Sequence, residues 1–214
     1  MDWPLTRYSI VAVVAIDAAE DAVPLARALL AGGVSTVEVT MRTPAALDAI
    51  AAIAADVPEI GIGAGTVLDP DHCAAAVDRG ARFAVAPGLN PAVVEAAAAA
   101  GLPFAPGVAT PSELDTAIRM GCRVVKFFPA AALGGTRYLK AVSAPYRHLG
   151  VRFVPTGGVS IDNLEEWLQL DEVEAVGGTW LARSADISSH RWDDIEERAR
   201  KAVAVSRRVR PLSA

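Results

Sequence analysis

A lysine lies within an apolar stretch that has the composition of a buried strand. Lys126 occupies the sequence Val-Val-Lys-Phe-Phe-Pro, residues 124–129. Because side chains alternate along a strand, Val125 and Phe127 would pack against helices and Lys126 would point inward. Burial disfavours the charged ammonium, which would leave a neutral, nucleophilic amine. The alternative is a lysine that extends from the strand end to solvent.

A carboxylate lies in a second strand-like stretch. The run Thr-Val-Glu-Val-Thr, residues 36–40, alternates strictly. This alternation predicts that Glu38 faces the same interior as Lys126. A buried carboxylate needs a partner or a proton, and Lys126 and Arg42 are the candidate cations. Glu38 could therefore move protons during a reaction, and a structural ion pair is the alternative.

Two more polar side chains follow predicted strands. Arg42 comes four residues after Glu38, in an expected loop. Its planar guanidinium suits the carboxylate of a substrate, although a solvated surface arginine would have the same sequence. Thr66 ends the stretch Gly-Ala-Gly-Thr, residues 63–66, and could hydrogen-bond a substrate carboxylate or hydroxyl. An ordinary turn from strand to loop is the alternative for Thr66.

Two Gly-Gly turns follow the last two predicted strands. They lie in Pro-Thr-Gly-Gly-Val-Ser, residues 155–160, and in Gly-Gly-Thr-Trp, residues 177–180. Glycine lets backbone N–H groups approach a ligand closely, and a helix that begins after such a turn attracts anions. Two such turns indicate a phosphate site, and two tight turns without a ligand are the alternative.

These residues belong to a pattern of alternating strands and helices that runs through the chain. Short β-branched runs begin near residues 10, 36, 60, 82, 103, 123, 151 and 173, and their spacing of roughly 20–28 residues fits one strand and one helix per unit. Eight units predict an α/β fold, a (β/α)8 TIM barrel in a single domain over residues 1–214. We expect a short additional helix over residues 3–9. An open, doubly wound sheet is the alternative topology.

The predicted barrel fold also predicts the location of the active site. In this fold the active site lies at the carboxyl ends of the strands, and the loops after strands seven and eight usually hold phosphate. Lys126, Glu38, Arg42 and the two Gly-Gly turns would all lie at that end.

Composition and charge exclude several classes of function. The net charge of -5 gives the chain no general attraction to nucleic acid or acidic membranes. The apolar run over residues 10–16 is short and acidic residues follow it, so we expect a buried strand and a soluble, cytoplasmic protein with no membrane segment. Cys73 and Cys122 lack a CxxC spacing, and no histidine groups with carboxylates. We therefore expect no disulfide and no metal site.

The motifs together resemble the family of 2-keto-3-deoxy-6-phosphogluconate (KDPG) and 4-hydroxy-2-oxoglutarate (KHG) aldolases. The matching segments span most of the chain and occur in the family's order: residues 37–43, 63–68, 86–89, 125–129, 155–160 and 177–180. One departure is Ala15, because many relatives carry arginine at the end of the first strand.

The resemblance implies a class I aldolase that assembles as a homotrimer and needs no metal or organic cofactor. Such an enzyme of the Entner–Doudoroff pathway cleaves KDPG to pyruvate and glyceraldehyde 3-phosphate. By resemblance, Lys126 forms the Schiff base and Glu38 is the general acid and base. The other implied contacts are Arg42, Thr66 and Thr156 for the pyruvyl carboxylate and nearby oxygens, Pro87 and Phe128 for the pocket wall, and Gly157, Gly158, Gly178 and Thr179 for the phosphate.

The sequence is also compatible with other substrates and with other classes of protein. KHG and the galactonate epimer of KDPG are alternative substrates for the same chemistry. A phosphate-binding isomerase or epimerase would need no imine, and a sugar-phosphate binding protein would show no turnover.

Overall fold

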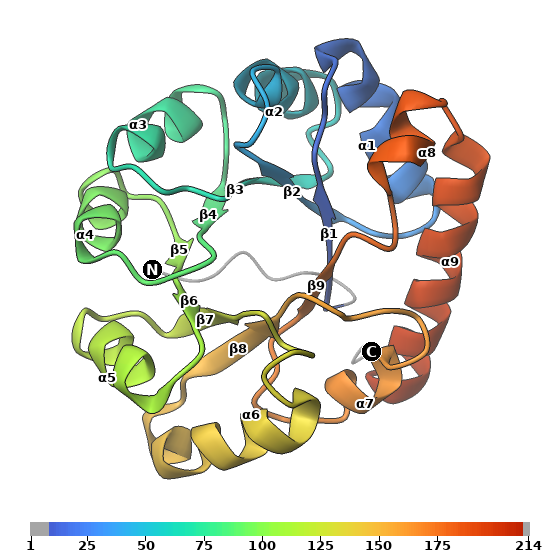
Figure 1. Ribbon diagram of the computed structural model, residues 1–214. Helices are drawn as coiled ribbons and strands as arrows, with labels where there is room; N and C mark the ends of the chain where they lie inside the picture. The colour runs from blue at the N-terminus through green and yellow to red at the C-terminus, as the bar shows by residue number, and fades with distance from the viewer. Residues whose placement is uncertain (1–8, 212–214) are drawn as a thin grey trace.

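Helices surround a curled parallel sheet in the computed structural model, which describes residues 9–211 (Figure 1). The strands are β1 (Ile10–Val14), β2 (Thr36–Thr40), β3 (Gly61–Gly65), β4 (Phe83–Val85), β5 (Phe104–Ala105), β6 (Gly107–Val108), β7 (Val124–Phe127), β8 (Arg152–Pro155) and β9 (Val176–Gly178). Six of them pair in the order β5-β4-β3-β2-β1-β9, and three more pair in the order β6-β7-β8. The expected α/β fold with parallel strands is confirmed.

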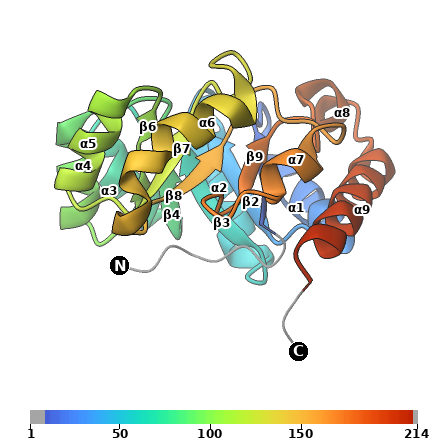
Figure 2. The same ribbon diagram turned by 90° about the horizontal axis from the view of Figure 1, so that it is seen from below.

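The helices lie on the outer face of this sheet, as the perpendicular view shows (Figure 2). They are α1 (Ala22–Ala31), α2 (Ala46–Asp56), α3 (Asp71–Asp78), α4 (Pro91–Ala99), α5 (Pro111–Arg119), α6 (Gly135–Ser143), α7 (Leu164–Leu168), α8 (Ser184–Ser188) and α9 (Trp192–Val209), with 3₁₀ turns η1 (Ala19–Asp21) and η2 (Ala144–Leu149). Prolines begin α4 and α5, where the missing N–H has no helical partner to lose. Thr110 and Glu113 form a capping box that fixes the start of α5.

Strand alternation sorts the side chains into two groups. Val37, Val39, Val125 and Phe127 are buried in the core between sheet and helices. Because neighbouring residues on a strand face opposite sides, the residues between them point into the space that the sheet encloses. A small apolar cluster that includes Val11 and Phe83 fills part of that space. The inward orientation predicted for Glu38 and Lys126 follows from this packing.

The expected single sheet of eight strands is not what the hydrogen bonds give. The fifth predicted strand is divided at Pro106: β5 pairs with β4, and β6 pairs with β7. Proline has no N–H to donate to a neighbouring strand, although the Pro106 carbonyl still accepts from the Lys126 amide at 2.9 Å. On the other side, isolated bridges Phe153↔Val173 and Thr156↔Gly177 connect the β8 and β9 segments.

Two smaller expectations also differ from the structure. The last strand begins at Val176, because Val173 pairs alone with Phe153 before the ladder to β1 starts. The helix expected over residues 3–9 lies outside the described residues except for Ser9, which directly precedes β1.

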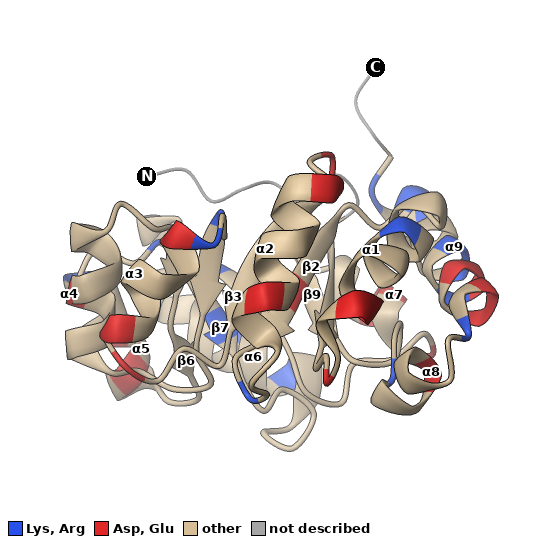
Figure 3. Cartoon of the chain, turned by 90° about the horizontal axis from the view of Figure 1, so that it is seen from above, with Lys and Arg blue, Asp and Glu red and all other residues tan. Residues whose placement is uncertain are grey.

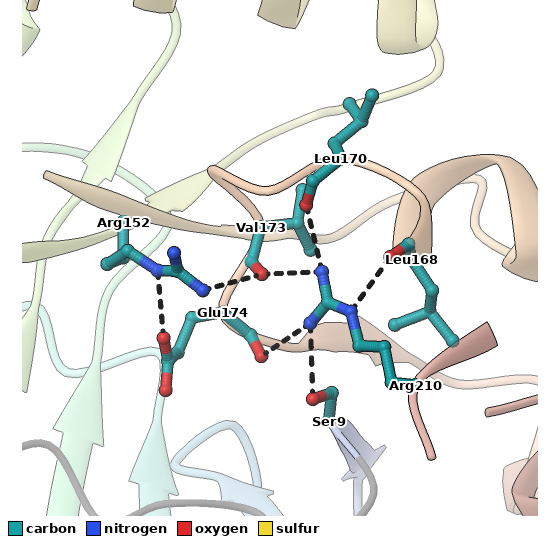
Figure 4. Close-up of polar contacts among 7 residues, drawn as sticks. All are labelled: Ser9, Arg152, Leu168, Leu170, Val173, Glu174 and Arg210. Atoms are coloured by element: carbon teal, nitrogen blue, oxygen red, sulfur yellow. Dashed lines mark hydrogen bonds and ion pairs between the residues drawn. The ribbon is translucent and has the colours of Figure 1, made fainter. Parts of the chain in front are cut away.

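One arginine ties the end of α9 to the segment between α7 and β9 and to the residue before β1 (Figure 4). Its guanidinium is half-buried and donates five hydrogen bonds. The Arg210 acceptors are the carbonyls of Leu168 (2.8 Å), Leu170 (2.8 Å), Val173 (2.9 Å) and Glu174 (3.4 Å) and the hydroxyl of Ser9 (3.2 Å). Arg210 therefore connects both ends of the described chain at the side of the sheet opposite the strand carboxyl ends.

Arg210→Met should lower the free energy of unfolding by about 2–3 kcal/mol, because several carbonyls lose their donor in a partly buried place. For a chain of this length, that loss corresponds to a drop of roughly 5–10 °C in melting temperature. Arg200→Met is the matched control on the same helix, since Arg200 forms exposed ion pairs with Glu196 and Glu197. Equal melting temperatures for the two variants in a thermal scan would contradict this role of Arg210.

Charged side chains of both signs are distributed over the outer helices, and α9 carries both (Figure 3). In residues 9–211, no helix combines the length and the apolar character needed to cross a membrane. Cys73 and Cys122 are free and buried, and burial raises the pKa of both thiols. Neither cysteine has the environment of a reactive thiolate.

Candidate active site

The inward side chains of β2 and β7 meet across the enclosed space as an ion pair. Lys126 Nζ lies 3.0 Å from Glu38 Oε1 and 3.3 Å from Oε2. Only 8% of the lysine side chain and 4% of the glutamate side chain are exposed. The sequence offered Lys126 and Arg42 as partners for Glu38, and the structure places Lys126 there. The alternative that Lys126 extends to solvent is wrong.

This pair can interconvert two protonation states without solvent. Moving one proton from the ammonium to the carboxylate turns a charged pair into a neutral amine and a carboxylic acid. The neutral amine is a nucleophile toward carbonyl carbon, and the acid can return a proton to a reacting oxygen.

A glycine on the neighbouring strand leaves room for the carboxylate. Gly65 ends β3 and pairs in register with Thr40. A Cβ atom added at Gly65 would overlap the Glu38 carboxylate. The sequence of residues 63–66 indicates only a turn from strand to loop, because nothing local to it reveals that Glu38 lies against Gly65.

The ion pair forms part of the wall of a cavity of about 170 Å³ at the carboxyl ends of the strands. All eleven residues expected to touch substrate line it: Glu38, Arg42, Thr66, Pro87, Lys126, Phe128, Thr156, Gly157, Gly158, Gly178 and Thr179. These residues come from six different strands or the loops that follow them. The structure thus brings the whole predicted set to one place.

Three residues of the cavity wall were not predicted: Val13, Thr40 and Val159. Alternation gives the signal for two of them. Val13 shares the inward face of β1 with Val11, and Thr40 shares the inward face of β2 with Glu38. Val159 follows the first Gly-Gly turn, where no strand period applies.

One wall of the cavity carries groups suited to a carboxylate. Arg42 Nε donates to Thr40 Oγ1 at 3.2 Å, which brings the exposed guanidinium to the rim. Thr66 has the left-handed φ of 57°, which is unusual for a β-branched residue. Such strain tends to be kept where a functional group must be aimed.

The two Gly-Gly turns form another part of the wall. Gly157 and Gly158 have φ values of 92° and 79°, in a backbone region that residues other than glycine rarely adopt. Gly178 and Thr179 line the cavity beside them. The bridge between Thr156 and Gly177 holds the two turns next to each other.

Lys126 Nζ lies 5.8 Å from the centre of the Phe128 ring, so an apolar surface borders the amine. The Phe128–Pro129 peptide bond that follows is cis. Among residues 9–211, His, Cys, Asp and Glu side chains form no group of three or more that could hold a metal ion. The cavity wall thus combines an amine paired with a carboxylate, a guanidinium and two glycine turns.

Comparison with known proteins relates this arrangement to a group of aldolases. The family model described as KDPG and KHG aldolase matches residues 1–198. The KHG/KDPG aldolase of Escherichia coli strain K12 is 44% identical over 199 residues, which are 93% of this chain and 92% of that protein.

Solved structures agree with the sequence match. KDPG aldolase from Legionella pneumophila, with pyruvate captured as a covalent carbinolamine intermediate, has a TM-score of 0.86 and 43% identity over 92% of this chain and 93% of that one. The KDPG aldolase of Zymomonas mobilis ZM4 with 3-phosphoglycerate has a TM-score of 0.84 and 35% identity over 92% of this chain and 91% of that one.

Proposed function

Because the chain belongs to the KDPG and KHG aldolase family, we propose that it cleaves KDPG to pyruvate and glyceraldehyde 3-phosphate through a Schiff base on Lys126. The single observation that carries the proposal is the buried pair, with Lys126 Nζ 3.0 Å from Glu38 Oε1 in the wall of a cavity. The captured carbinolamine of the Legionella relative supports the same first step.

The reaction begins at the C2 carbonyl of the substrate. Glu38 takes a proton from Lys126, and the neutral amine attacks C2 to give a carbinolamine. Glu38 then protonates the departing hydroxyl, which leaves as water and gives the protonated imine. This cation draws in the electron pair of the C3–C4 bond when that bond breaks.

Glu38 and Lys126 would also carry out the cleavage of the C3–C4 bond and the release of the products. The C4 hydroxyl loses its proton to Glu38 and becomes the carbonyl of glyceraldehyde 3-phosphate. The enamine left on Lys126 takes a proton at C3, and water hydrolyses the resulting imine to pyruvate and free amine. Atoms balance, because the water lost in forming the imine is replaced at hydrolysis.

The cavity wall supplies the binding contacts of the proposed reaction. Arg42, Thr66 and Thr156 would hold the keto-acid carboxylate and nearby oxygens, since a guanidinium and hydroxyls suit them. Pro87 and Phe128 would border the reacting carbons. Backbone of the two Gly-Gly turns, with Thr179, would hold the phosphate. The 3-phosphoglycerate of the Zymomonas structure supports an anion-accepting end.

KHG is a second candidate substrate, because the Escherichia coli relative is named for both KHG and KDPG. It has the same C2 ketone and C4 hydroxyl, so the same two residues would serve. The galactonate epimer of KDPG differs only in configuration. Turnover of the three compounds, measured side by side through pyruvate release, ranks them.

We also propose that the chain forms one closed (β/α)8 barrel over residues 1–214 and works as a homotrimer in the cytoplasm. Two observations support closure: the bridges that connect the β8 and β9 segments, and the single residue, Pro106, that separates β5 from β6 along the chain. The family resemblance supports the trimer, and the small polar substrate fits the cytoplasm.

Borohydride trapping tests the proposed function. Reduction of the protein with pyruvate present should add the mass of a reduced pyruvyl group to Lys126, as located by peptide mapping. Lys140 is an exposed lysine on α6 and serves as the internal control for unspecific modification. An adduct spread evenly over Lys126 and Lys140, or no adduct, would refute the imine and favour an isomerase or a binding protein.

A further inference from the structure

A buried threonine links the end of β1 to the guanidinium at the cavity rim. Thr40 Oγ1 donates to the Val14 carbonyl at 3.0 Å and accepts from Arg42 Nε at 3.2 Å. Thr40 is only 2% exposed, whereas Arg42 is exposed. The contact therefore joins a buried point of the sheet to a long, exposed side chain.

The direction of these two bonds follows from the chemistry of a hydroxyl. A threonine hydroxyl has one proton and two lone pairs. The proton is directed to Val14, a carbonyl that can only accept. A lone pair is then directed to Arg42, whose guanidinium can only donate. Only one arrangement of donors and acceptors is therefore possible: Arg42 donates to the Thr40 hydroxyl, and that hydroxyl donates to the Val14 carbonyl.

A second threonine of the same loop repeats the contact with the end of β1. Thr43 Oγ1 donates to the Ile16 carbonyl at 2.5 Å. The carbonyls of Val14 and Ile16 lie on either side of Ala15, and Arg42 lies between the two threonines in sequence. We call Thr40 and Thr43, with these two carbonyls, the threonine clamp.

The clamp would change how Arg42 binds an anion. An exposed arginine samples many rotamers, and binding a ligand must remove that freedom. Holding Nε in advance fixes the plane of the guanidinium. The terminal nitrogens Nη1 and Nη2 are the ones that a planar carboxylate engages in a bidentate pair.

We infer that Thr40 is a positioning residue that orients Arg42 toward the carboxylate of the keto acid. The inference rests on the proposed function, since it presupposes that pyruvate binds covalently beside Arg42. It goes further than the proposed function, because it makes binding of the carboxylate by Arg42 depend on the hydroxyl of Thr40, which need not touch the ligand. It predicts that losing this hydroxyl affects ligands with a carboxylate and spares ligands without one.

The test compares two carbonyl compounds in the borohydride reaction. Pyruvate carries the carboxylate and acetone does not, while both can form an imine with Lys126. For Thr40→Val, the pyruvate concentration that gives half-maximal trapping should rise about tenfold, the effect of one charge-assisted hydrogen bond. The corresponding acetone concentration should change less than about twofold. Thr40→Ser keeps the hydroxyl and should restore pyruvate trapping.

Three controls make the result specific. Thr116→Val removes an exposed threonine hydroxyl on α5 that bonds the Ser112 carbonyl, and it should leave both compounds unchanged. In an Arg42→Met background, Thr40→Val should have no further effect on pyruvate, because the group it orients is gone. Thr40→Ala repeats the experiment if valine lowers the yield of folded protein.

The outcomes separate the positioning role from the proposed function. Unchanged pyruvate trapping in Thr40→Val, or equal losses with pyruvate and acetone, would overturn the role of Thr40 while Lys126 still forms its adduct. Failure of the unsubstituted protein to trap pyruvate would instead overturn the proposed function, and the inference that rests on it would go with it.

Discussion

Lys126→Met should lower the rate of KDPG cleavage by roughly 10⁴-fold or more, because the covalent route is lost entirely. Methionine has a similar length and no amine, so it cannot form an imine. Pyruvate release, coupled to lactate dehydrogenase, measures the remaining rate. Lys140→Met is the matched control and should retain full activity, since Lys140 lies on the outside of α6.

The same variant tests the cost of an unpaired carboxylate. Removing one member of a buried ion pair costs about 3–5 kcal/mol, because the other charge stays behind without a partner. Glu38 would then be protonated or poorly solvated, and Lys126→Met should unfold at a lower temperature. Adding Glu38→Gln should recover much of the stability and none of the activity.

This double variant separates chemistry from folding. If Lys126→Met kept a rate within about tenfold of the unsubstituted protein, imine formation on Lys126 would be wrong. If stability recovered in the double variant and activity recovered with it, the lysine would be structural.

Glu38→Gln alone should lower the rate of cleavage by about 10²–10⁴-fold, the usual contribution of a general acid and base. Glutamine keeps the size of the side chain and can accept a hydrogen bond from Lys126, but it cannot take and return a proton at neutral pH. The loss should therefore come mainly in kcat, with a smaller change in KM.

A partial reaction isolates the proton transfer at carbon. The enzyme should exchange the methyl protons of pyruvate for deuterium in heavy water through the enamine, and NMR follows that exchange. Glu38→Gln should slow it together with cleavage. Exchange at the original rate would assign the transfer at C3 to another group and leave Glu38 as a partner of Lys126.

Much of the site could be predicted because strand alternation is a local property. Val37 and Val39 beside Glu38, and Val125 and Phe127 beside Lys126, identify the inward residues without any tertiary contact. In parallel α/β folds the carboxyl ends of the strands lie together, so inward residues and end loops from the whole chain converge. All eleven predicted residues line one cavity for this reason.

Other features depend on distances between segments that the chain does not encode locally. Glu38 had two candidate cations. The choice of Lys126 rests on the 3.0 Å between Lys126 Nζ and Glu38 Oε1, which belong to residues 88 positions apart in sequence. The need for glycine at position 65 and the link from Thr40 to Val14 are likewise contacts between neighbouring strands.

The division of the sheet at Pro106 likewise depends on contacts between segments and not on the local sequence alone. Pro106 is visible in the sequence, yet whether its missing N–H interrupts pairing depends on which neighbour that N–H would have faced. The five bonds of Arg210 join residues from positions 9 to 210. Periodicity in the sequence specified which side of each strand is buried, because that depends on two neighbouring residues. The partner of each buried polar group was set by folding, because it depends on register and curvature across the sheet.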